Sequence, residues 1–305
     1  MTMQMNGYHC YRQLKEPSEW YEIELLVQYM SALYWKRNGG KIGIYTEPKH
    51  LSILDKYKMT NIYDFVDSET LLRLPSSIDI NRFWALSKLL CHNNISESEY
   101  CILDTDMYLR KVPTLPNVSF VGAHPETHNT AKGQEVYKRL EEFLDLELYE
   151  KYKDFEEVKP INTSFMYIND KELVHKWTEV ALQIAKHISK SPSFYGEMMT
   201  IEQRFLPIVC EELNKSYSSL ISNSYLTAKI PDTDGKEWDP YPYTGGNLLE
   251  VSKYFFHLWG LKQQLNNKVL RDSVMRVLVR DIDLDFPQYY SRIKKKFPTI
   301  KQYFK

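Results

Sequence analysis

The sequence contains few cysteines and no long hydrophobic run. Its four cysteines are widely spaced and form no Cys-x-x-Cys pair: Cys10, Cys91, Cys101 and Cys210. That spacing excludes a zinc knuckle and a dithiol redox motif, and it favours reduced thiols in apolar surroundings. The purely apolar stretches are only a few residues long, whereas a membrane-spanning helix needs ~20 residues. Because residues 1–10 also lack the basic and apolar regions of a signal peptide, we expect a cytoplasmic protein.

An overall excess of positive charge is also absent. The net charge is −1, and residues 286–305 contain six basic residues and no acidic one. The rest of the chain has 33 basic residues against 40 acidic ones, so we do not expect a nucleic-acid binder. No segment repeats with a period of about 20 to 50 residues, which excludes solenoid and propeller folds.

Aromatic residues, by contrast, are plentiful. They make up 14% of the 305 residues and include 23 tyrosines. Flat rings with polar tips suit sugar binding, although we expect most of them to fill a core. A hydrophobic content of 43% is ample for one large core.

Strand and helix patterns alternate along the first half of the chain. Strands are predicted at 7–11, 41–46, 99–103, 118–122 and 161–168. Helices are predicted at 19–37, 50–57, 81–92, 132–157, 171–188 and 200–213, and a long loop at 231–246. This alternation predicts an α/β fold with a mostly parallel sheet covered by helices on both faces. We expect one domain over residues 1–265 and a helical C-terminal extension over 266–305.

One pair of carboxylates stands at the end of a predicted strand. Asp104-Thr105-Asp106 directly follows the apolar run 99–103. Ligands of such sheets bind beyond the carboxyl ends of the strands, and carboxylates are ligands for magnesium or manganese. Similar triplets at 232–234 and 281–285 follow no apolar strand. The alternative is a solvated turn in which Asp104 closes the backbone.

Four motifs in a fixed order resemble the GT-A glycosyltransferases, particularly the retaining family of glycogenin and the bacterial lipopolysaccharide galactosyltransferases. They are the Asp104-Thr105-Asp106 triplet, the strand start Asn162-Thr163-Ser164, the pair Glu202-Gln203, and His257-x-x-Gly260-x-Lys262. Together they extend over residues 100–262. The chain departs from the family pattern at Ser164, where a Gly is usual, at Glu202, where an Asp is usual, and after Lys262, where Pro-Trp is missing.

The resemblance implies a GT-A fold and a divalent metal, Mn²⁺ or Mg²⁺, bound by Asp104, Asp106 and His257. Gly260 would let the backbone approach a diphosphate, and Lys262 would place a positive charge on it. The alternative for His257 is a structural histidine after an aromatic strand.

The resemblance also implies roles in binding the donor. A basic residue on the helix before the metal strand would reach the diphosphate or the base, and Lys88 aligns best, with Arg82 as the other candidate. The first strand would hold the nucleobase, where Tyr8, His9 and Tyr11 are available. The alternative for both cations is a solvent-facing position.

Three further residues are implied near the donor sugar. Asn162 would face the sugar, and Glu202 and Gln203 would lie near the reacting carbon. For Asn162 the alternative is a turn residue. For Gln203 it is a capping box with Thr200.

The resulting hypothesis is a metal-dependent glycosyltransferase. It would move a hexosyl unit from a UDP-sugar to a hydroxyl of a glycan or lipid-linked acceptor, with retention, in polysaccharide or lipopolysaccharide synthesis. The basic aromatic tail, 286–305, suggests peripheral contact with an anionic membrane, and the alternative is an ordinary solvated helix. A non-catalytic carbohydrate- or partner-binding protein on the same fold remains open, as does a sugar-nucleotide nucleotidyltransferase.

Overall fold

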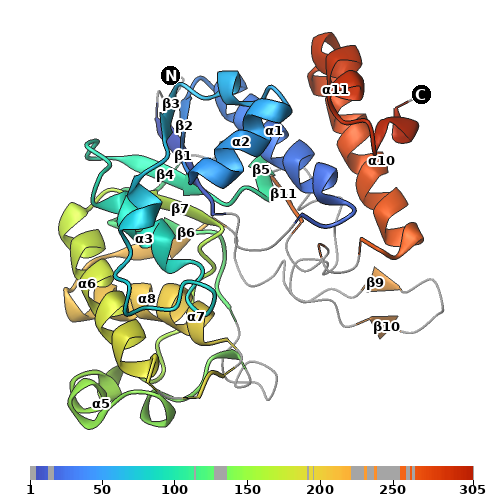
Figure 1. The fold of residues 1–305 in the computed structure, drawn as a ribbon. Helices are drawn as coiled ribbons and strands as arrows, with labels where there is room; N and C mark the ends of the chain where they lie inside the picture. Colours follow the sequence, from blue (N-terminus) through green and yellow to red (C-terminus); the bar gives the residue numbers. More distant parts are fainter. Residues whose placement is uncertain are drawn as a thin grey trace.

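A seven-stranded mixed sheet forms the centre of the computed structural model (Figure 1). The structure describes residues 5–12, 17–112, 115–126, 136–190, 192–194, 196–220, 230–231, 237–238, 255–258, 262 and 265–304. The strand order is β3-β2-β1-β4-β7-β6-β8. The strands are β1 (Asn6–Cys10), β2 (Lys41–Tyr45), β3 (Phe65–Asp67), β4 (Tyr100–Leu103), β6 (Phe120–Gly122), β7 (Phe165–Ile168) and β8 (Tyr217–Ser219).

The strand directions confirm the predicted α/β class. β1 is parallel to β2 and β4, and β2 is parallel to β3. β7 runs antiparallel between β4 and β6, and β6 is parallel to β8. Two small antiparallel pairs lie outside this sheet: β5 (Met107–Leu109) with β11 (Phe255–His257), and β9 (Ile230–Pro231) with β10 (Glu237–Trp238). Apart from Ile230, the β9–β10 pair falls within the region 231–246 that was predicted as a loop, and most of that region lies outside the described residues.

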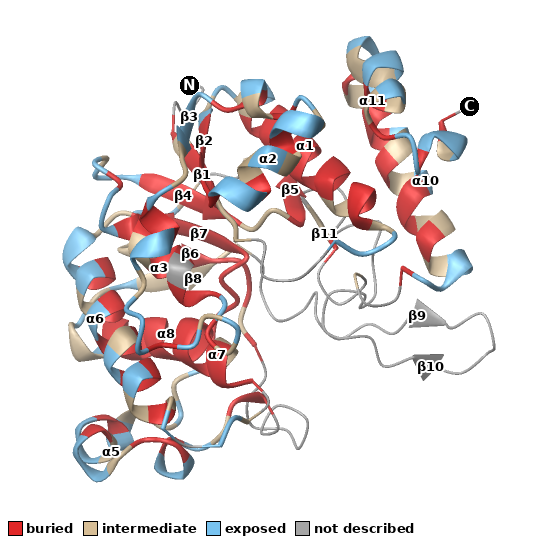
Figure 2. Ribbon diagram, in the orientation of Figure 1, coloured by how far each residue is buried: buried red, intermediate tan, exposed pale blue. Residues whose placement is uncertain are grey.

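Helices cover both faces of the sheet, as predicted. One core contains side chains of α1 (Tyr21–Arg37), α2 (Pro48–Lys56), α10 (Lys268–Asp285) and α11 (Tyr290–Lys296). The other contains side chains of α3 (Leu86–His92), α5 (Leu146–Tyr152), α6 (Lys171–Ile188), α7 (Glu197–Met199) and α8 (Phe205–Glu212). Successive residues of a strand point to opposite faces, so Cys101 and Leu103 join the first core while Tyr100 and Ile102 join the second. The central strands β4, β7 and β6 are therefore buried on both sides, whereas the edge strand β3 is largely exposed (Figure 2).

Two predicted helices differ from those observed. The helix predicted at 81–92 begins only at Leu86, because Asp79 accepts the backbone N–H of Asn81 and folds the preceding residues into turns. The helix predicted at 132–157 is interrupted within its described part. Asp145 accepts the N–H of Leu148 and starts a separate short helix, α5.

The C-terminal helices are tied into the core on the α1 side. Asp281 of α10 accepts a hydrogen bond from the Tyr108 hydroxyl at 2.7 Å, and Asp285 accepts one from Tyr34 at 2.6 Å. Phe297 and Phe304 of the basic tail are buried in the same core. The boundary at 265/266 stays a prediction, since this segment shares its core with α1. No helix in the described ranges is long and apolar enough to cross a membrane.

Candidate metal centre

A backbone turn places the two predicted carboxylates at the carboxyl edge of the sheet. Asp104 follows β4, and its N–H donates to the carbonyl oxygen of Ser164 at 2.7 Å. Asp106 precedes β5, which pairs with β11 so that His257 lies opposite Met107. The Leu258 N–H donates to the Asp106 carbonyl oxygen at 2.8 Å. This pairing brings the histidine beside the triplet from a distant part of the chain.

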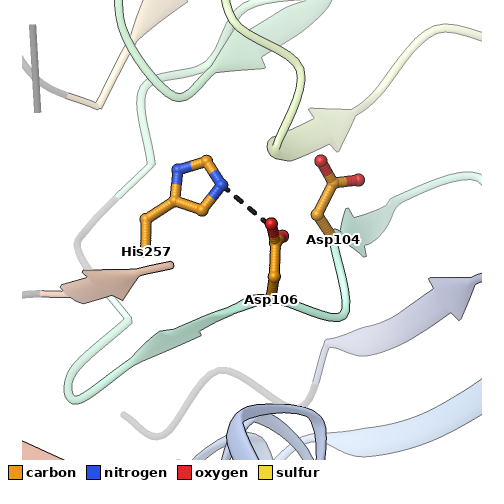
Figure 3. A group of neighbouring side chains, drawn as sticks. All are labelled: Asp104, Asp106 and His257. Carbon is orange, nitrogen blue, oxygen red and sulfur yellow. Dashed lines mark ion pairs between the residues drawn. The ribbon is translucent and has the colours of Figure 1, made fainter. Parts of the chain in front are cut away.

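The three side chains form one cluster (Figure 3). One ligand atom each from Asp104, Asp106 and His257 lie within 4.8 Å of one another. Asp106 is only 4% exposed, so the alternative of a solvated turn does not describe it. The two carboxylates suit magnesium or manganese, and the imidazole favours manganese.

Asp106 is held in its charged form. Lys262 Nζ lies 2.7 Å from Asp106 Oδ2, and His257 Nε2 lies 3.5 Å from Oδ1. Burial alone would raise the pKa of Asp106, but Lys262 and His257 outweigh burial and hold that pKa well below its ordinary value. The carboxylate is therefore an ionised, buried ligand group whose charge is balanced by a lysine. A divalent cation would supply the same compensation.

Lys88, in α3, contacts the cluster through Asp104. This buried side chain reaches from α3 to Asp104 Oδ1 at 3.0 Å and to the Thr163 carbonyl oxygen at 3.3 Å, and it also contacts the Glu202 carboxylate. Burial would lower the pKa of Lys88, but Asp104 and Glu202 raise it. Lys88 thus links the metal triplet to Glu202, and the solvent-facing alternative does not describe it.

Arg82 lies elsewhere. Its guanidinium pairs with both carboxylate oxygens of Glu197 in α7, at 2.6 and 2.7 Å. It also donates to the Pro192 carbonyl oxygen at 3.3 Å. Of the two predicted cations on this helix, the structure brings only Lys88 to the cluster.

Glu202 and Gln203 lie in a π-helical segment, Thr200–Arg204, between α7 and α8. Burial, with a contribution from Asp104, raises the pKa of Glu202, and Lys88 opposes that shift. The Gln203 side-chain oxygen accepts a hydrogen bond from the Tyr137 hydroxyl. The capping box does not form, because the helix has already begun at Glu197 and the Thr200 hydroxyl donates to the Val136 carbonyl oxygen at 3.1 Å.

Asn162 is linked to the cluster through Ser164. Its Nδ2 donates to Glu126 Oε1 at 3.0 Å, and its Oδ1 accepts the Ser164 N–H at 2.9 Å. These bonds close the turn that leads into β7. That turn supplies the carbonyl oxygens of Thr163 and Ser164 to Lys88 and to the Asp104 N–H. The two hydrogen bonds of the Asn162 side chain are those expected of a turn residue, which was the alternative to a sugar-binding role.

The two predicted tyrosines lie at different edges of the sheet. Tyr11 follows the carboxyl end of β1, where burial and Glu24 raise its pKa to about 12 while Lys262 opposes the shift. The Tyr8 hydroxyl donates to Glu97 at 2.8 Å, and Glu97 precedes β4, at the amino edge. The structure therefore brings Tyr11, and not Tyr8, towards the cluster. Gly260 lies outside the described residues.

One charged residue near the cluster was not predicted. Glu24, in the first turn of α1, has its pKa raised by burial, lowered by Lys262 and raised by Asp106. It therefore lies within electrostatic reach of the Asp106–Lys262 pair. An acidic residue in the first turn of a helix is common for dipole reasons alone, so the sequence carried no signal for this position.

Comparisons with known proteins gave only distant similarities. No protein-family model matches the chain, and no curated protein sequence matches it. Solved structures do match in shape, and glycosyltransferases are among them.

The first is the glycosyltransferase GlyE of Streptococcus pneumoniae TIGR4, at 12% identity and a TM-score of 0.38 over 71% of this chain and 45% of GlyE. This chain thus spans less than half the length of GlyE. The second is the galactosyltransferase LgtC, solved in complex with donor and acceptor sugar analogs, at 12% identity and 0.39 over 73% of this chain and 75% of LgtC.

The third is a glycosyltransferase involved in the glycosylation of the major capsid of PBCV-1, at 12% identity and a TM-score of 0.42 over 88% of this chain and 98% of the other. At such identities and TM-scores these similarities support no conclusion about this chain, and the function proposed below rests on the residues of the cluster.

Proposed function

We propose that the protein is a metal-dependent glycosyltransferase that uses a nucleotide-diphosphate sugar as donor. The observation that carries the proposal is the cluster of Asp104, Asp106 and His257, whose ligand atoms lie within 4.8 Å of one another and in which Asp106 and His257 are buried and Asp104 is partly exposed. These three residues would hold Mn²⁺, or Mg²⁺. When bound, the metal supplies Lewis-acid stabilisation of the charge that develops on a leaving diphosphate.

Lys262 and Lys88 have separate roles in this proposal. The Lys262 side chain is 34% exposed beside Asp106, and it would place its positive charge on a phosphate of the donor. Lys88 is buried and held by Asp104, Glu202 and the Thr163 carbonyl oxygen. It would orient Asp104 rather than contact the donor directly. Tyr11, at the end of β1, would lie near the nucleobase of a UDP-sugar.

The environment of Glu202 bears on the stereochemical route. A double displacement with retention needs a carboxylate nucleophile, and Glu202 is the candidate. Its buried ion pair with Lys88 engages the carboxylate and weakens it as a nucleophile. This contact supports a front-face route with retention, in which the leaving phosphate helps to deprotonate the acceptor hydroxyl. Gln203 and Asn162 would complete the wall of the site.

The acceptor is proposed to be a hydroxyl of a glycan or a lipid-linked glycan, in cytoplasmic polysaccharide or lipopolysaccharide synthesis. Peripheral membrane contact through residues 286–305 would depend on the basic side chains. Phe297 and Phe304 of that segment are buried in the core, so these two rings are not available to an interface.

Donor hydrolysis with Mn²⁺, screened across nucleotide sugars, tests the proposal. We expect turnover with at least one UDP-sugar and its loss in Asp106→Asn. Asp283→Asn is the matched control, because Asp283 belongs to another Asp-x-Asp sequence and is exposed on α10. Undiminished turnover in Asp106→Asn contradicts the proposal. Metal-dependent binding of the nucleotide without turnover by any donor would instead favour the non-catalytic carbohydrate-binding protein.

A further inference from the structure

A second cavity lies away from the metal centre, between α1 and the segment that joins α10 to α11. Its volume is about 540 Å³, and its lining includes Tyr29 and Arg37 of α1 together with Tyr289 and Arg292. No residue of the metal cluster lines it. At a rise of 1.5 Å per residue, Arg37 lies ~20 Å along α1 from Glu24, which faces the metal centre. The cavity is therefore a separate site.

Some charges at this cavity are balanced within the protein. Arg37 pairs with Asp285 at 2.5 Å, and Lys36 pairs with Asp64 at 3.0 Å. Both pairs are partly exposed, and each uses one carboxylate for one cation. These acidic residues are thus already engaged with cations of α1.

Three other cations lack such partners, and of these only Arg292 lines the cavity, while Lys296 and Lys58 stand outside its lining. Lys296 Nζ donates to the Lys58 carbonyl oxygen at 2.6 Å and stands 4.5 Å from the centre of the Tyr29 ring. Arg292 lines the cavity one turn earlier on α11. Among the described residues, no carboxylate forms an ion pair with Arg292, Lys296 or Lys58. Glu22, also on α1, is engaged by the Tyr57 hydroxyl and the Thr299 N–H.

Burial and neighbouring positive charges both act on Lys296. Burial lowers its pKa to about 8, and the charges of Arg292 and Lys58 contribute to the same shift. Positive charges that repel one another at a cavity are stabilised by a bound anion. The cavity therefore combines room for a ligand with a surplus of positive charge.

We propose that this cavity binds a phosphate-bearing anion, held by Arg292 of its lining and by Lys296 next to Tyr29, with Tyr29 and Tyr289 against its organic part. The guanidinium fork matches the oxygens of a phosphate, and the neighbouring ammonium adds a point charge. A volume of about 540 Å³ is in the range of small-molecule sites. The ligand is either a soluble phosphate ester or the headgroup of an anionic phospholipid. The inference does not depend on the glycosyltransferase proposal.

The binding of inorganic phosphate can be read at Lys296 itself. Acetic anhydride acetylates the neutral amine, so we would measure the acetylation rate of Lys296 by peptide mass spectrometry, with phosphate and with chloride at equal ionic strength. We expect phosphate to slow the acetylation of Lys296 but not that of Lys301, which is exposed on the same tail. Arg292→Gln should need about tenfold more phosphate for the same protection, the loss expected for one charged hydrogen bond.

Lys295→Gln is the matched control, because it removes one charge from the same helix at an exposed position that does not line the cavity. The proposal is overturned if phosphate protects Lys296 no better than chloride. It is also overturned if Lys295→Gln shifts the phosphate dependence as much as Arg292→Gln.

Sedimentation with vesicles then identifies the source of the phosphate. The vesicles would be pure phosphatidylcholine or phosphatidylcholine mixed with phosphatidylglycerol. Once phosphate protection is established, a selective loss of binding to the mixed vesicles in Arg292→Gln supports a phospholipid headgroup. Equal binding by Arg292→Gln and Lys295→Gln supports a soluble phosphate ester.

Discussion

The metal centre and the cavity beside α11 treat charge in opposite ways. At the metal centre, buried charges face opposite charges: Asp106 faces Lys262, and Lys88 faces Asp104 and Glu202. Next to the α11 cavity, Lys296 has Arg292 and Lys58 as charged neighbours, and its pKa falls to about 8 through burial and their repulsion. The first arrangement is suited to exchanging one cation for another, and the second to gaining an anion. The two regions should therefore respond differently to the loss of a single charge.

Among the substitutions considered, removal of the Lys88 charge should lower the unfolding free energy most. Lys88→Met leaves Glu202 buried without its cation, and such a loss costs about 3–5 kcal/mol of unfolding free energy. Denaturant unfolding measures this cost. Lys88→Met/Glu202→Gln should recover part of it, because the uncompensated charge is gone.

The matched change at the cavity is Arg292→Gln. Arg292 is exposed and has other cations as neighbours. The substitution should therefore change the unfolding free energy of the protein by less than about 0.5 kcal/mol. Equal destabilisation by Lys88→Met and Arg292→Gln would remove the distinction between the two regions.

Glu126 offers a contrast with Asp106, because no neighbouring positive charge outweighs the effect of burial on its pKa. Burial raises its pKa to about 7, and the hydrogen bond from Asn162 opposes this only in part. The folded protein therefore holds this proton more tightly than the unfolded chain does. The stability that Glu126 contributes is complete below its unfolded pKa of about 4.3 and is lost as the pH rises through about 7.

Glu126→Gln should remove this pH dependence, since the Gln oxygen can still accept from Asn162. Relative to the variant, the wild-type protein should lose about 3 kcal/mol of unfolding free energy between about pH 4 and pH 8. Unfolding curves recorded across that range measure the difference. A constant difference between the two proteins would mean that Glu126 is ionised throughout.

Glu24 should give the smallest effect. It lies within electrostatic reach of Asp106 and Lys262, and its negative charge favours a cation at the metal centre. Glu24→Gln should weaken Mn²⁺ binding a few-fold, as measured by calorimetric titration. Glu19→Gln removes a charge just ahead of the same helix and serves as the control. Unchanged affinity in Glu24→Gln would place this residue outside the site.

The strand-end position of the Asp104-Thr105-Asp106 triplet could be predicted because it depends on local patterns. An apolar strand followed by two carboxylates fixes which edge they occupy, and α6 was predicted with its bounds because Asp170 caps a strongly amphipathic segment. The approach of His257 followed from the resemblance, and the β5–β11 pairing is its physical cause.

Side-chain partners that come from distant elements were not predictable. The contact of Lys88 with Glu202 joins α3 to a π-helical segment, and no periodicity encodes it. The approach of Glu24 to Lys262 depends on the tertiary position of α1. The tail suggested a membrane interface by composition, yet Phe297 and Phe304 pack inside because α10 and α11 fold back on α1.

Direct Mn²⁺ binding tests the central claim most closely, because it needs neither donor nor acceptor. Titration of the purified protein followed by electron paramagnetic resonance of free Mn²⁺ should reveal one site in the wild-type protein. Asp106→Asn should weaken that site by at least about tenfold, the effect of losing a charged ligand, while Asp283→Asn should leave it unchanged. Equal Mn²⁺ binding by the wild-type protein and Asp106→Asn, or no binding by the wild-type protein, would contradict a metal centre at Asp104, Asp106 and His257.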